Sequence, residues 1–227
     1  MNNSFGMKYR KVSYLVCLLL IVGHADVVAQ QPQGDYVLVF SDEFNGHSGS
    51  QPDPAKWSRP YRNPSTWARW ISNSEKVVSL RGGKLVCRAI PNRSEPADTA
   101  RMLTGAVETR GKYSFQYGKV EVRMKTNLRP GNFPAAWMKA DDRYNDIRYG
   151  EIDIVETYGH EGKSAHTVHT HRSNTLKKEG IQREFKRPLD VNRWHVYGVE
   201  WTPDAIDWTV DGEKVGEYRR VRTPQME

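Results

Sequence analysis

The most constraining stretch of the chain runs from Gly150 to Glu156 and places three carboxylates among β-branched residues. Side chains of an extended strand alternate between two faces, so Glu151 and Asp153 point away from the isoleucines beside them. Strict alternation would send Glu156 to the apolar face, where an unpaired ionised carboxylate costs several kcal/mol. A β-bulge at Ile154–Val155 inserts one extra residue and returns Glu156 to the acidic face. The sequence therefore predicts a bulged strand with three carboxylates on one face.

Carboxylates crowded onto one strand face repel one another, and the repulsion raises the pKa of at least one of them. Retaining glycoside hydrolysis uses an ionised nucleophile and a protonated acid about 5–5.5 Å apart, and neighbouring same-face positions can supply this separation. The middle carboxylate, Asp153, would hydrogen-bond the nucleophile. The alternative interpretation is a solvated acidic strand face without chemistry. A helix is disfavoured, because β-branched residues fill the run and glycines bracket it at Gly150 and Gly159.

The run from Gly150 to Glu156 resembles the signature of glycoside hydrolase family 16 in its bulged Glu-x-Asp-x-x-Glu form, which is found among laminarinase-like enzymes. The resemblance covers roughly Tyr36 to Tyr218. Five further segments resemble other landmarks of the family, in the same order: Phe40–Phe44, Gly105–Thr109, Tyr117–Arg123, Phe133–Trp137 and Val199–Asp204.

Catalytic roles follow from this resemblance residue by residue. It implies Glu151 as the nucleophile, Asp153 as its electrostatic helper and Glu156 as the general acid/base. The physical chemistry agrees, because negative charge on Glu151 raises the pKa of Glu156 and keeps its proton in place. Once a glycosyl-enzyme forms, Glu151 is neutral and Glu156 can act as a base on water.

Brief apolar or alternating runs follow one another through the body of the chain, separated by Gly, Pro and Asn and without a long helical period. This density of short strands predicts an all-β sandwich, with a tight hairpin at Asp211-Gly212. The resemblance implies a concanavalin A-like jelly roll, in which two curved antiparallel sheets form a substrate cleft on the concave face. The expected strands are Tyr36–Phe40, Lys76–Leu80, Lys84–Ala89, Gly105–Thr109, Lys119–Thr126, Ala135–Lys139, Glu151–Tyr158, His166–His171, His195–Glu200, Ala205–Val210 and Glu213–Tyr218.

Residues 1–29 have the pattern of a secretory signal peptide. Three basic residues precede a short apolar run from Val12 to Val22, and small residues precede a cleavage site near Ala29 or Gln30. The run is shorter than the ~20 apolar residues of a transmembrane helix. Cys17 lies too close to Lys11 for a lipoprotein signal. We therefore expect a secreted protein, periplasmic or extracellular, with no membrane span.

Residues 30–227 would form one domain, the family 16 catalytic domain, large enough to bury a sizeable core. Cleavage would leave Cys87 as its one cysteine, so we expect no disulfide within the chain. The leader carries three basic residues and one acidic residue, and its removal lowers the net charge from +7 to +5. The basic residues are scattered and form no stripe for nucleic acid. We expect a monomer whose partner is a polysaccharide.

Glycan sites are commonly floored by Trp or Tyr, because sugar rings present apolar C–H faces. Trp137 is the best candidate, since it matches the family's tryptophan beside the catalytic strand. Trp67 and Trp70 are weaker candidates for the far end of the cleft. Trp201 and Trp208 alternate with apolar neighbours, and we expect both in the core.

Three histidines lie in one predicted strand shortly after the acidic one. Thr167, His169 and His171 share a face, and His166 takes the other with Val168. If this strand pairs with the acidic one, His169 or His171 can hydrogen-bond the glycan or the acid. One alternative is zinc, because His-x-His with a carboxylate is a plausible ligand spacing, but spacing dictates no third ligand. The other is a hydrogen-bonded surface role, and we assign no metal ligand.

Two features depart from the family pattern. Members often carry Trp-Pro shortly before the signature, whereas Arg148-Tyr149 precedes it here, so Tyr149 is expected to shape a different subsite; Asn132 is a further substrate-binding candidate. The chain ends at Glu227, where the family continues with further strands, so we expect a C-terminally truncated domain. A structural calcium, which many members bind, would lose a ligand there. We expect no required cofactor and assign no calcium ligand.

The resemblance implies a secreted, retaining, endo-acting glycoside hydrolase but leaves its glycan open. Our first hypothesis is β-1,3- or mixed-linkage β-glucan, because Phe133–Trp137 and the histidine-rich strand resemble laminarinase-type members. The second is endo-β-galactosidase activity on galactan or mucin-type O-glycan, which the basic charge favours. A non-catalytic, lectin-like sandwich is the third, and it would need none of the three carboxylates.

Overall fold

The computed structural model describes residues 36–93, 95–141, 148–159, 161–174 and 183–221. The predicted signal peptide lies outside these residues. Within them, no helix is long and apolar enough to cross a membrane. The strands are β1 (Val78–Leu80), β2 (Leu85–Cys87), β3 (Ala89–Pro91), β4 (Met102–Thr104), β5 (Gly118–Met124), β6 (Ala135–Lys139), β7 (Gly150–Glu156), β8 (Lys163–Thr170), β9 (Glu184–Pro188), β10 (His195–Trp201), β11 (Ala205–Val210) and β12 (Glu213–Arg219), and the helix is α1 (His171–Asn174).

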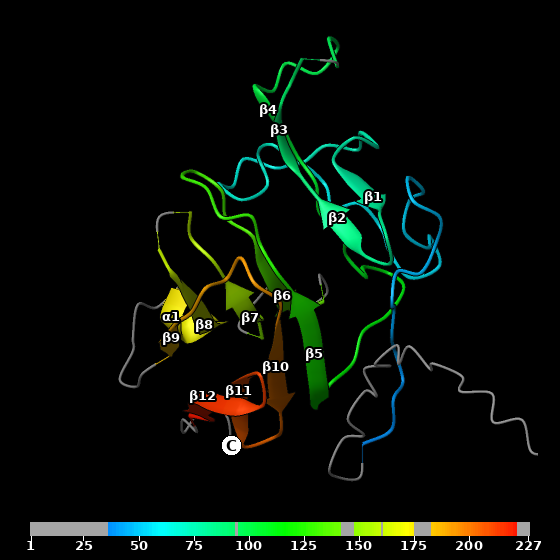
Figure 1. Cartoon of the computed structure of the whole chain (residues 1–227). Coiled ribbons are helices and arrows are strands. Elements are labelled where there is room, and N and C mark those ends of the chain that lie inside the picture. The colour runs from blue at the N-terminus through cyan, green and yellow to red at the C-terminus, as the bar shows by residue number, and fades with distance from the viewer. Residues whose placement is uncertain (1–35, 94, 142–147, 160, 175–182, 222–227) are drawn as a thin grey trace, which may run out of the picture. The chain divides into compact units, whose positions relative to one another are not determined.

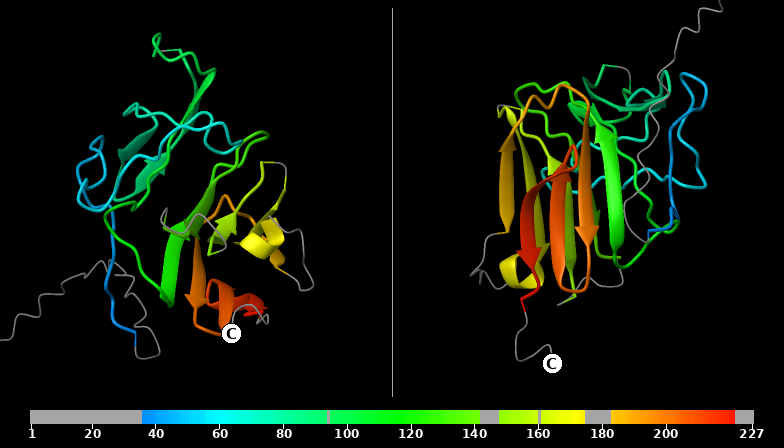
Figure 2. Two further views of the ribbon diagram at one scale, coloured as in Figure 1. Left: turned by 180° about the vertical axis from the view of Figure 1, so that it is seen from behind. Right: turned by 60° about the horizontal axis from the view of Figure 1, so that its bottom comes forward.

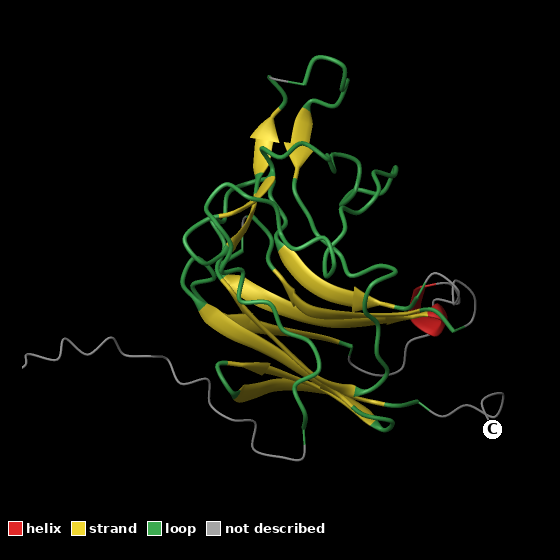
Figure 3. Ribbon diagram, turned by 90° about the vertical axis from the view of Figure 1, so that its right-hand side faces the viewer, coloured by secondary structure: helices red, strands yellow, loops and turns green. Residues whose placement is uncertain are grey.

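Two four-stranded antiparallel sheets organise this all-β domain (Figure 1). One sheet has the order β6-β7-β8-β9 and contains the acidic strand, and the other has the order β12-β11-β10-β5. Figures 2 and 3 show them as two layers. Two further pairs, β1-β2 and β3-β4, form small sheets of their own. The predicted antiparallel sandwich is therefore confirmed.

The hydrophobic core lies between the two large sheets. Across the layers, Gly216 of β12 leaves room for Phe185 of β9, because a Cβ at 216 would lie 2.2 Å from the Phe185 ring. Trp208 is fully buried, as predicted, while Trp201 is half-buried and packs against the core. The buried residues of this core are Ile152, Ile154, Val155, Val168, Tyr197, Val199, Ile206, Trp208 and Val210.

The acidic strand β7 is bulged where the sequence predicts it. Against β6, Asp153 pairs with Trp137 and Val155 with Ala136, which leaves Ile154 without a partner. The register with β8 also shifts between Asp153 and Glu156. Ile154 and Val155 are consecutive and yet both buried in the core, 2% and 0% exposed, so the alternation is reset.

The predicted hairpin forms, whereas two of the predicted strands do not. Asp211 and Gly212 both have positive φ, 53° and 82°, as the predicted tight hairpin between β11 and β12 requires. The expected strands at Tyr36–Phe40 and Gly105–Thr109 are wrong, since neither segment is a strand. Tyr36–Phe40 is irregular and largely exposed, and in Gly105–Thr109 the backbone of Glu108 forms an isolated β-bridge with Ser58.

Candidate active site

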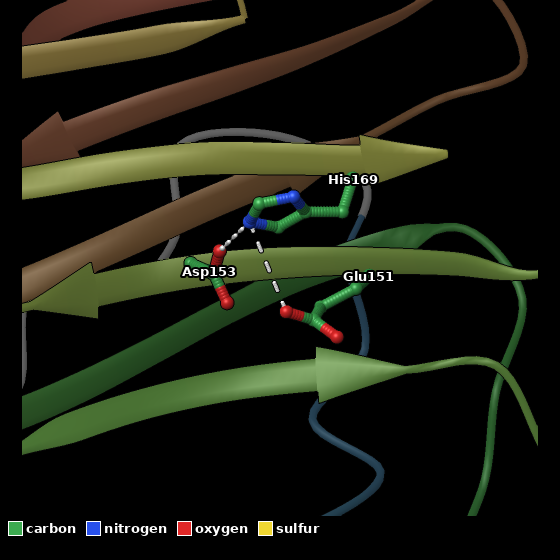
Figure 4. A group of neighbouring side chains, drawn as sticks. All are labelled: Glu151, Asp153 and His169. Carbon is green, nitrogen blue, oxygen red and sulfur yellow. Dashed lines mark ion pairs between the residues drawn. The ribbon is translucent and has the colours of Figure 1, made fainter. Parts of the chain in front are cut away.

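Glu151 and Asp153 project from the same face of β7 toward His169 of β8 (Figure 4). The register places Glu151 opposite His169 and Asp153 opposite Thr167. Nε2 of His169 lies 3.2 Å from Oδ2 of Asp153 and 3.9 Å from Oε1 of Glu151. The histidine therefore bridges two of the three carboxylates, which confirms that the two strands pair and that His169 faces the acidic side.

His169 is held in turn by Arg183, which lies just before β9. A guanidinium nitrogen of Arg183 is 3.2 Å from Nδ1 of His169. Because guanidinium groups only donate hydrogen bonds, Nδ1 accepts this one, so a neutral ring carries its hydrogen on Nε2. The approach of Nε2 to Asp153 lacks hydrogen-bond geometry, since Oδ2 of Asp153 is buried without a hydrogen-bond partner among the described residues. The Asp153 side chain is only 3% exposed, so the nearby imidazole acts on this buried carboxylate electrostatically.

Tyr149 contacts the predicted nucleophile directly. Its hydroxyl donates a hydrogen bond to Oε2 of Glu151. Burial raises the pKa of Glu151 and the negative charge of Asp153 acts in the same direction, while the hydrogen bond from Tyr149 and the positive charge of Lys139 oppose them. Burial and the Glu151 carboxylate also raise the pKa of Tyr149, so the phenol keeps its proton and remains a donor.

Glu156 occupies a different environment at the far end of the bulge. Its Oε2 lies 3.3 Å from the hydroxyl of Tyr158 and 3.4 Å from Oγ1 of Thr167. Burial, followed by the negative charge of Asp153, raises the pKa of Glu156 to about 7. Near neutral pH this carboxyl can therefore hold a proton and release it, as a general acid/base must.

Aromatic rings flank the carboxylates on the neighbouring segments. Trp137 of β6 is paired with Asp153 and meets Trp67 edge-on, with ring centroids 5.2 Å apart; Trp67 is 43% exposed. Phe133, also 43% exposed, stacks on Tyr158 at a centroid distance of 4.9 Å. These rings offer apolar surface of the kind that sugar C–H faces prefer, close to the strand that carries the acids.

The structure brings together some of the predicted substrate-binding residues and separates others. His169, Tyr149 and Trp137 lie at the carboxylates. His171 does not continue the strand, because β8 ends at Thr170 and His171 begins α1, so its expected place on a shared strand face is wrong. The amide of Asn132 hydrogen-bonds the backbone of its own turn, to Arg129 N and Asn127 O.

Trp70, the remaining candidate, is half-buried. The guanidinium carbon of Arg69 lies 5.2 Å from the centroid of the Trp70 ring. Its contact with substrate, like those of Asn132 and His171, stays a prediction. Sequence reasoning did not assign roles to Tyr158 and Arg183. Strand alternation places Tyr158, two residues beyond Glu156, on the same face as that acid, and this could have indicated a role for it. No feature of the sequence pointed to Arg183.

The acidic site also has the composition of a metal site. Within the described part of the chain, one group of donors could hold a metal ion: Glu151, Asp153 and His169, with one atom from each within 4.8 Å of the others. The His-x-His arrangement proposed for zinc is not present, since His171 is not in this group. The same three residues form the carboxylate site itself, so metal and glycan would compete for it.

A β-sandwich with paired carboxylates in unequal environments, flanked by aromatic rings, is the arrangement of a carbohydrate-cleaving domain. Residues 67–226 match the model of the family described as glycosyl hydrolases family 16. The chain belongs to this family. The predicted family and jelly-roll fold are thereby confirmed.

Several characterised proteins are similar over most of the chain. A beta-glucanase from Rhodothermus marinus is 32% identical over 89% of this chain and 72% of its own length. A keratan-sulfate endo-1,4-beta-galactosidase from Sphingobacterium multivorum is also 32% identical over 82% of this chain. That protein is longer, and the match spans 44% of its length.

Solved structures agree with this assignment. The laminarinase from Rhodothermus marinus superposes with a TM-score of 0.68 at 30% identity, covering 80% of this chain and 74% of that one. SCLam, a non-specific endo-beta-1,3(4)-glucanase from family GH16, gives a TM-score of 0.72 at 28% identity, covering 84% and 74%.

Proposed function

We propose that the chain is a retaining endo-β-glycosidase that cleaves β-1,3- or mixed-linkage β-glucan. The observation that carries the proposal is the bulge of β7, which places Glu156, with a pKa of about 7, on the side of the strand that carries Glu151 and Asp153. Similarity to a beta-glucanase and to a laminarinase supports the choice of glucan.

In the first half-reaction, Glu151 attacks the anomeric carbon while Glu156 donates its proton to the departing glycosidic oxygen. Tyr149 holds the attacking carboxylate through its hydrogen bond to Oε2, which leaves the other oxygen, Oε1, for the sugar. Asp153 and its partner His169 keep the charge pattern in place.

In the second half-reaction, Glu156 removes a proton from water, which attacks the glycosyl-enzyme and releases Glu151. Esterification has removed the negative charge of Glu151 by then, so Glu156 more readily stays ionised until it takes that proton. Two displacements at the same carbon retain its configuration. Side chains supply every group in this scheme, so it requires no cofactor; a structural calcium is left unassigned.

A second candidate is endo-β-galactosidase activity on galactan or on a mucin-type glycan. The 32% identity to a keratan-sulfate endo-1,4-beta-galactosidase favours it, and so does the net charge of +5 on residues 30–227. A lectin-like role would use the same aromatic rings without the acids. We also propose that the protein is exported and acts as a monomer outside the cytoplasm.

A digestion panel tests these candidates. Laminarin, barley glucan, agarose, mucin and keratan sulfate are incubated with the protein, and the products are separated by chromatography. We expect oligosaccharides of intermediate length from laminarin or barley glucan, with none after Glu151→Ala. Cleavage of keratan sulfate or agarose alone would support the galactosidase, and binding without cleavage of any member would support the lectin.

A further inference from the structure

The bulge leaves one residue of β7 without a place in either neighbouring ladder. Ile154 has no partner in the register with β6 or in that with β8. Its carbonyl oxygen instead lies 2.7 Å from Nδ1 of His166, a side chain with 0% exposure. A buried carbonyl that lost this donor would have no water to replace it.

The hydrogen-bond partners of His166 define its protonation. A carbonyl oxygen only accepts, so Nδ1 carries the hydrogen. Nε2 lies 3.0 Å from Oγ of Ser164, which is also fully buried, and accepts the hydrogen of that hydroxyl. Burial lowers the pKa of His166, and the positive charge of Arg187 adds to the effect, so the ring stays neutral with Nδ1 as its donor.

The preceding carbonyl is held from the opposite sheet. Nε1 of Trp208, in β11, donates a hydrogen bond of 2.9 Å to the carbonyl oxygen of Asp153. Trp208 is 0% exposed, so this contact is also shielded from water. Two consecutive carbonyls of the bulge, those of Asp153 and Ile154, are thus each held by a buried side-chain N–H, one from β8 and one from β11.

We propose that His166 and Trp208 are positioning residues, which hold the bulge of β7 and so set where the carboxyl of Glu156 lies relative to that of Glu151. Neither residue is exposed, so neither reaches the sugar. Both act through the backbone: His166 holds the carbonyl two residues before Glu156, and Trp208 holds the carbonyl three residues before it. The proposal rests on the proposed function, since it concerns the same pair of carboxylates.

Packing alone does not account for these side chains. His166 lies on the core face of β8, which it shares with Val168, an aliphatic residue that is 4% exposed. A polar ring costs more than an aliphatic one at such a position unless its nitrogens are bonded. Both nitrogens of His166 are bonded, and one of the two bonds goes to the bulge.

Kinetics of two variants at the same position test the proposal. His166→Leu removes the donor, whereas His166→Asn can place an amide N–H near the position of Nδ1. Since displacement of a reacting group by about 1 Å can cost about 100-fold, we expect His166→Leu to lower kcat on the glycan by about 100-fold with KM within about twofold. His166→Asn should recover most of that loss, and Trp208→Phe should lose about tenfold.

The matched control is Val210→Ala, a core substitution in β11 that removes no bond to the bulge. It should keep kcat within about twofold. An activated dinitrophenyl glycoside adds a second readout, because release of a good leaving group does not need the acid. The burst of dinitrophenolate should be nearly unchanged in His166→Leu if the carboxyl of Glu156 is what has moved.

A titration that needs no substrate separates this inference from the proposed function. Carbon-13 NMR of labelled glutamate carboxyls should show Glu156 titrating near 7 in the parent protein and lower in His166→Leu, where the carboxyl leaves its buried place beside Asp153. Val210→Ala should titrate like the parent. A parent that cleaves no glycan but shows this shift would refute the function and leave the positioning role standing.

Ser164→Ala provides the test if His166→Leu does not fold. Loss of the hydroxyl frees the ring to exchange tautomers, and we expect kcat to fall by about threefold to tenfold, with a smaller shift of the Glu156 titration. The inference is overturned if His166→Leu, or Ser164→Ala where the leucine variant does not fold, keeps the parent kcat and titration while Trp208→Phe does so too. It is also overturned if Val210→Ala loses as much activity as His166→Leu.

Discussion

The imidazole of His169 lies 3.2 Å from the carboxylate of Asp153, and it comes from the strand next to the one that carries the acids. The aspartate side chain is almost fully buried and its Oδ2 lacks a hydrogen-bond partner among the described residues, so the nearby imidazole stabilises its charge through space. Arg183 holds the other ring nitrogen. Two residues outside the signature thus support the middle carboxylate, Asp153. The carboxyls on either side of it, those of Glu151 and Glu156, lie in different environments and can differ in protonation.

The first prediction separates the roles of the two glutamates. Glu151→Ala leaves a gap on the nucleophile side, so azide or formate should partly restore turnover and give a product of inverted configuration. Glu156→Ala should lower kcat on the glycan by about 10²–10⁴-fold, keep the burst with activated substrates, and give azide products of retained configuration. NMR of fresh products reads the stereochemistry.

Glu121→Ala is the control for both variants, because Glu121 is an exposed glutamate of β5, paired with Lys119. It should hydrolyse the glycan at the parent rate. Inverted product from the parent protein would contradict the double-displacement scheme, and the assignment of Glu151 as nucleophile would fall with it.

The second prediction concerns pH. The acid must be protonated, so kcat/KM should fall as pH rises through about 7, the pKa of Glu156. It should also fall at low pH as Glu151, whose pKa is raised by burial, becomes protonated and loses its nucleophilicity. A pH–rate profile on an unactivated glycan measures both limbs. In Glu156→Gln the limb near 7 should disappear.

Stability should follow the same group with a defined sign. The folded state holds the proton of Glu156 up to about pH 7, whereas the unfolded chain releases it near the ordinary value of 4.5, so the free energy of unfolding falls as pH rises between these values. The loss is about 1 kcal/mol once solvent screening of the half-buried carboxyl is allowed for. Glu156→Gln should remove most of this slope in urea titrations, leaving the part due to Glu151.

The third prediction distinguishes carboxylate catalysis from zinc catalysis. Hydrolysis should survive EDTA, apart from any loss of calcium-dependent stability, because the scheme uses side chains alone. Added Zn²⁺ should inhibit, since Glu151, Asp153 and His169 offer it a compact set of donors. His169→Gln should weaken that inhibition. Activity abolished by EDTA and restored specifically by zinc would overturn the carboxylate mechanism.

The fourth prediction tests the contact between the layers. Gly216→Ala puts a methyl group against the Phe185 ring, and overpacking of this kind costs about 1–3 kcal/mol of unfolding free energy. Gly162→Ala is the matched control, because a Cβ there meets nothing within 4 Å. Urea denaturation should show a lower midpoint for the first variant alone. Equal midpoints would mean that β9 and β12 are not in close contact.

The fifth prediction concerns export. Amino-terminal sequencing of protein recovered outside the cytoplasm should begin near Gln30 or Gln31, because a basic start and a short apolar run direct secretion and cleavage. A mature chain that begins at a lipidated Cys17 would contradict this, and so would a protein retained in the cytoplasm at full length.

Sequence reasoning succeeded where one residue could satisfy only one arrangement. Glu156 follows two apolar residues, and burying it with Ile154 would leave its charge in the core without a partner. A bulge avoids that free-energy cost, so it was the arrangement to expect. Asp211-Gly212 was similarly constrained, because positive φ at both positions suits few other pairs. These local rules hold whatever the rest of the chain does.

Tertiary contacts decided the features that sequence reasoning missed. Tyr36–Phe40 is a continuous apolar run of the kind that strands contain, but it lies outside both large sheets and has no ladder partner among the described residues. Strand β9 is mostly charged and has no regular alternation of charged and apolar residues, so what makes it a strand is its pairing with β8. The bond from His166 to Ile154 could not be read from one strand, because it depends on register between two.

The stacking of Phe133 on Tyr158 joins a residue at the surface to one beside the acid. Phe133 is exposed enough to meet a sugar, while the hydroxyl of Tyr158 reaches Glu156. A substitution at Phe133 that altered which glycan fits would therefore also shift the tyrosine that helps set the proton affinity of the acid. Redesign of this loop for a new substrate would therefore also change the pH optimum, and substrate specificity and pH optimum would have to be selected together.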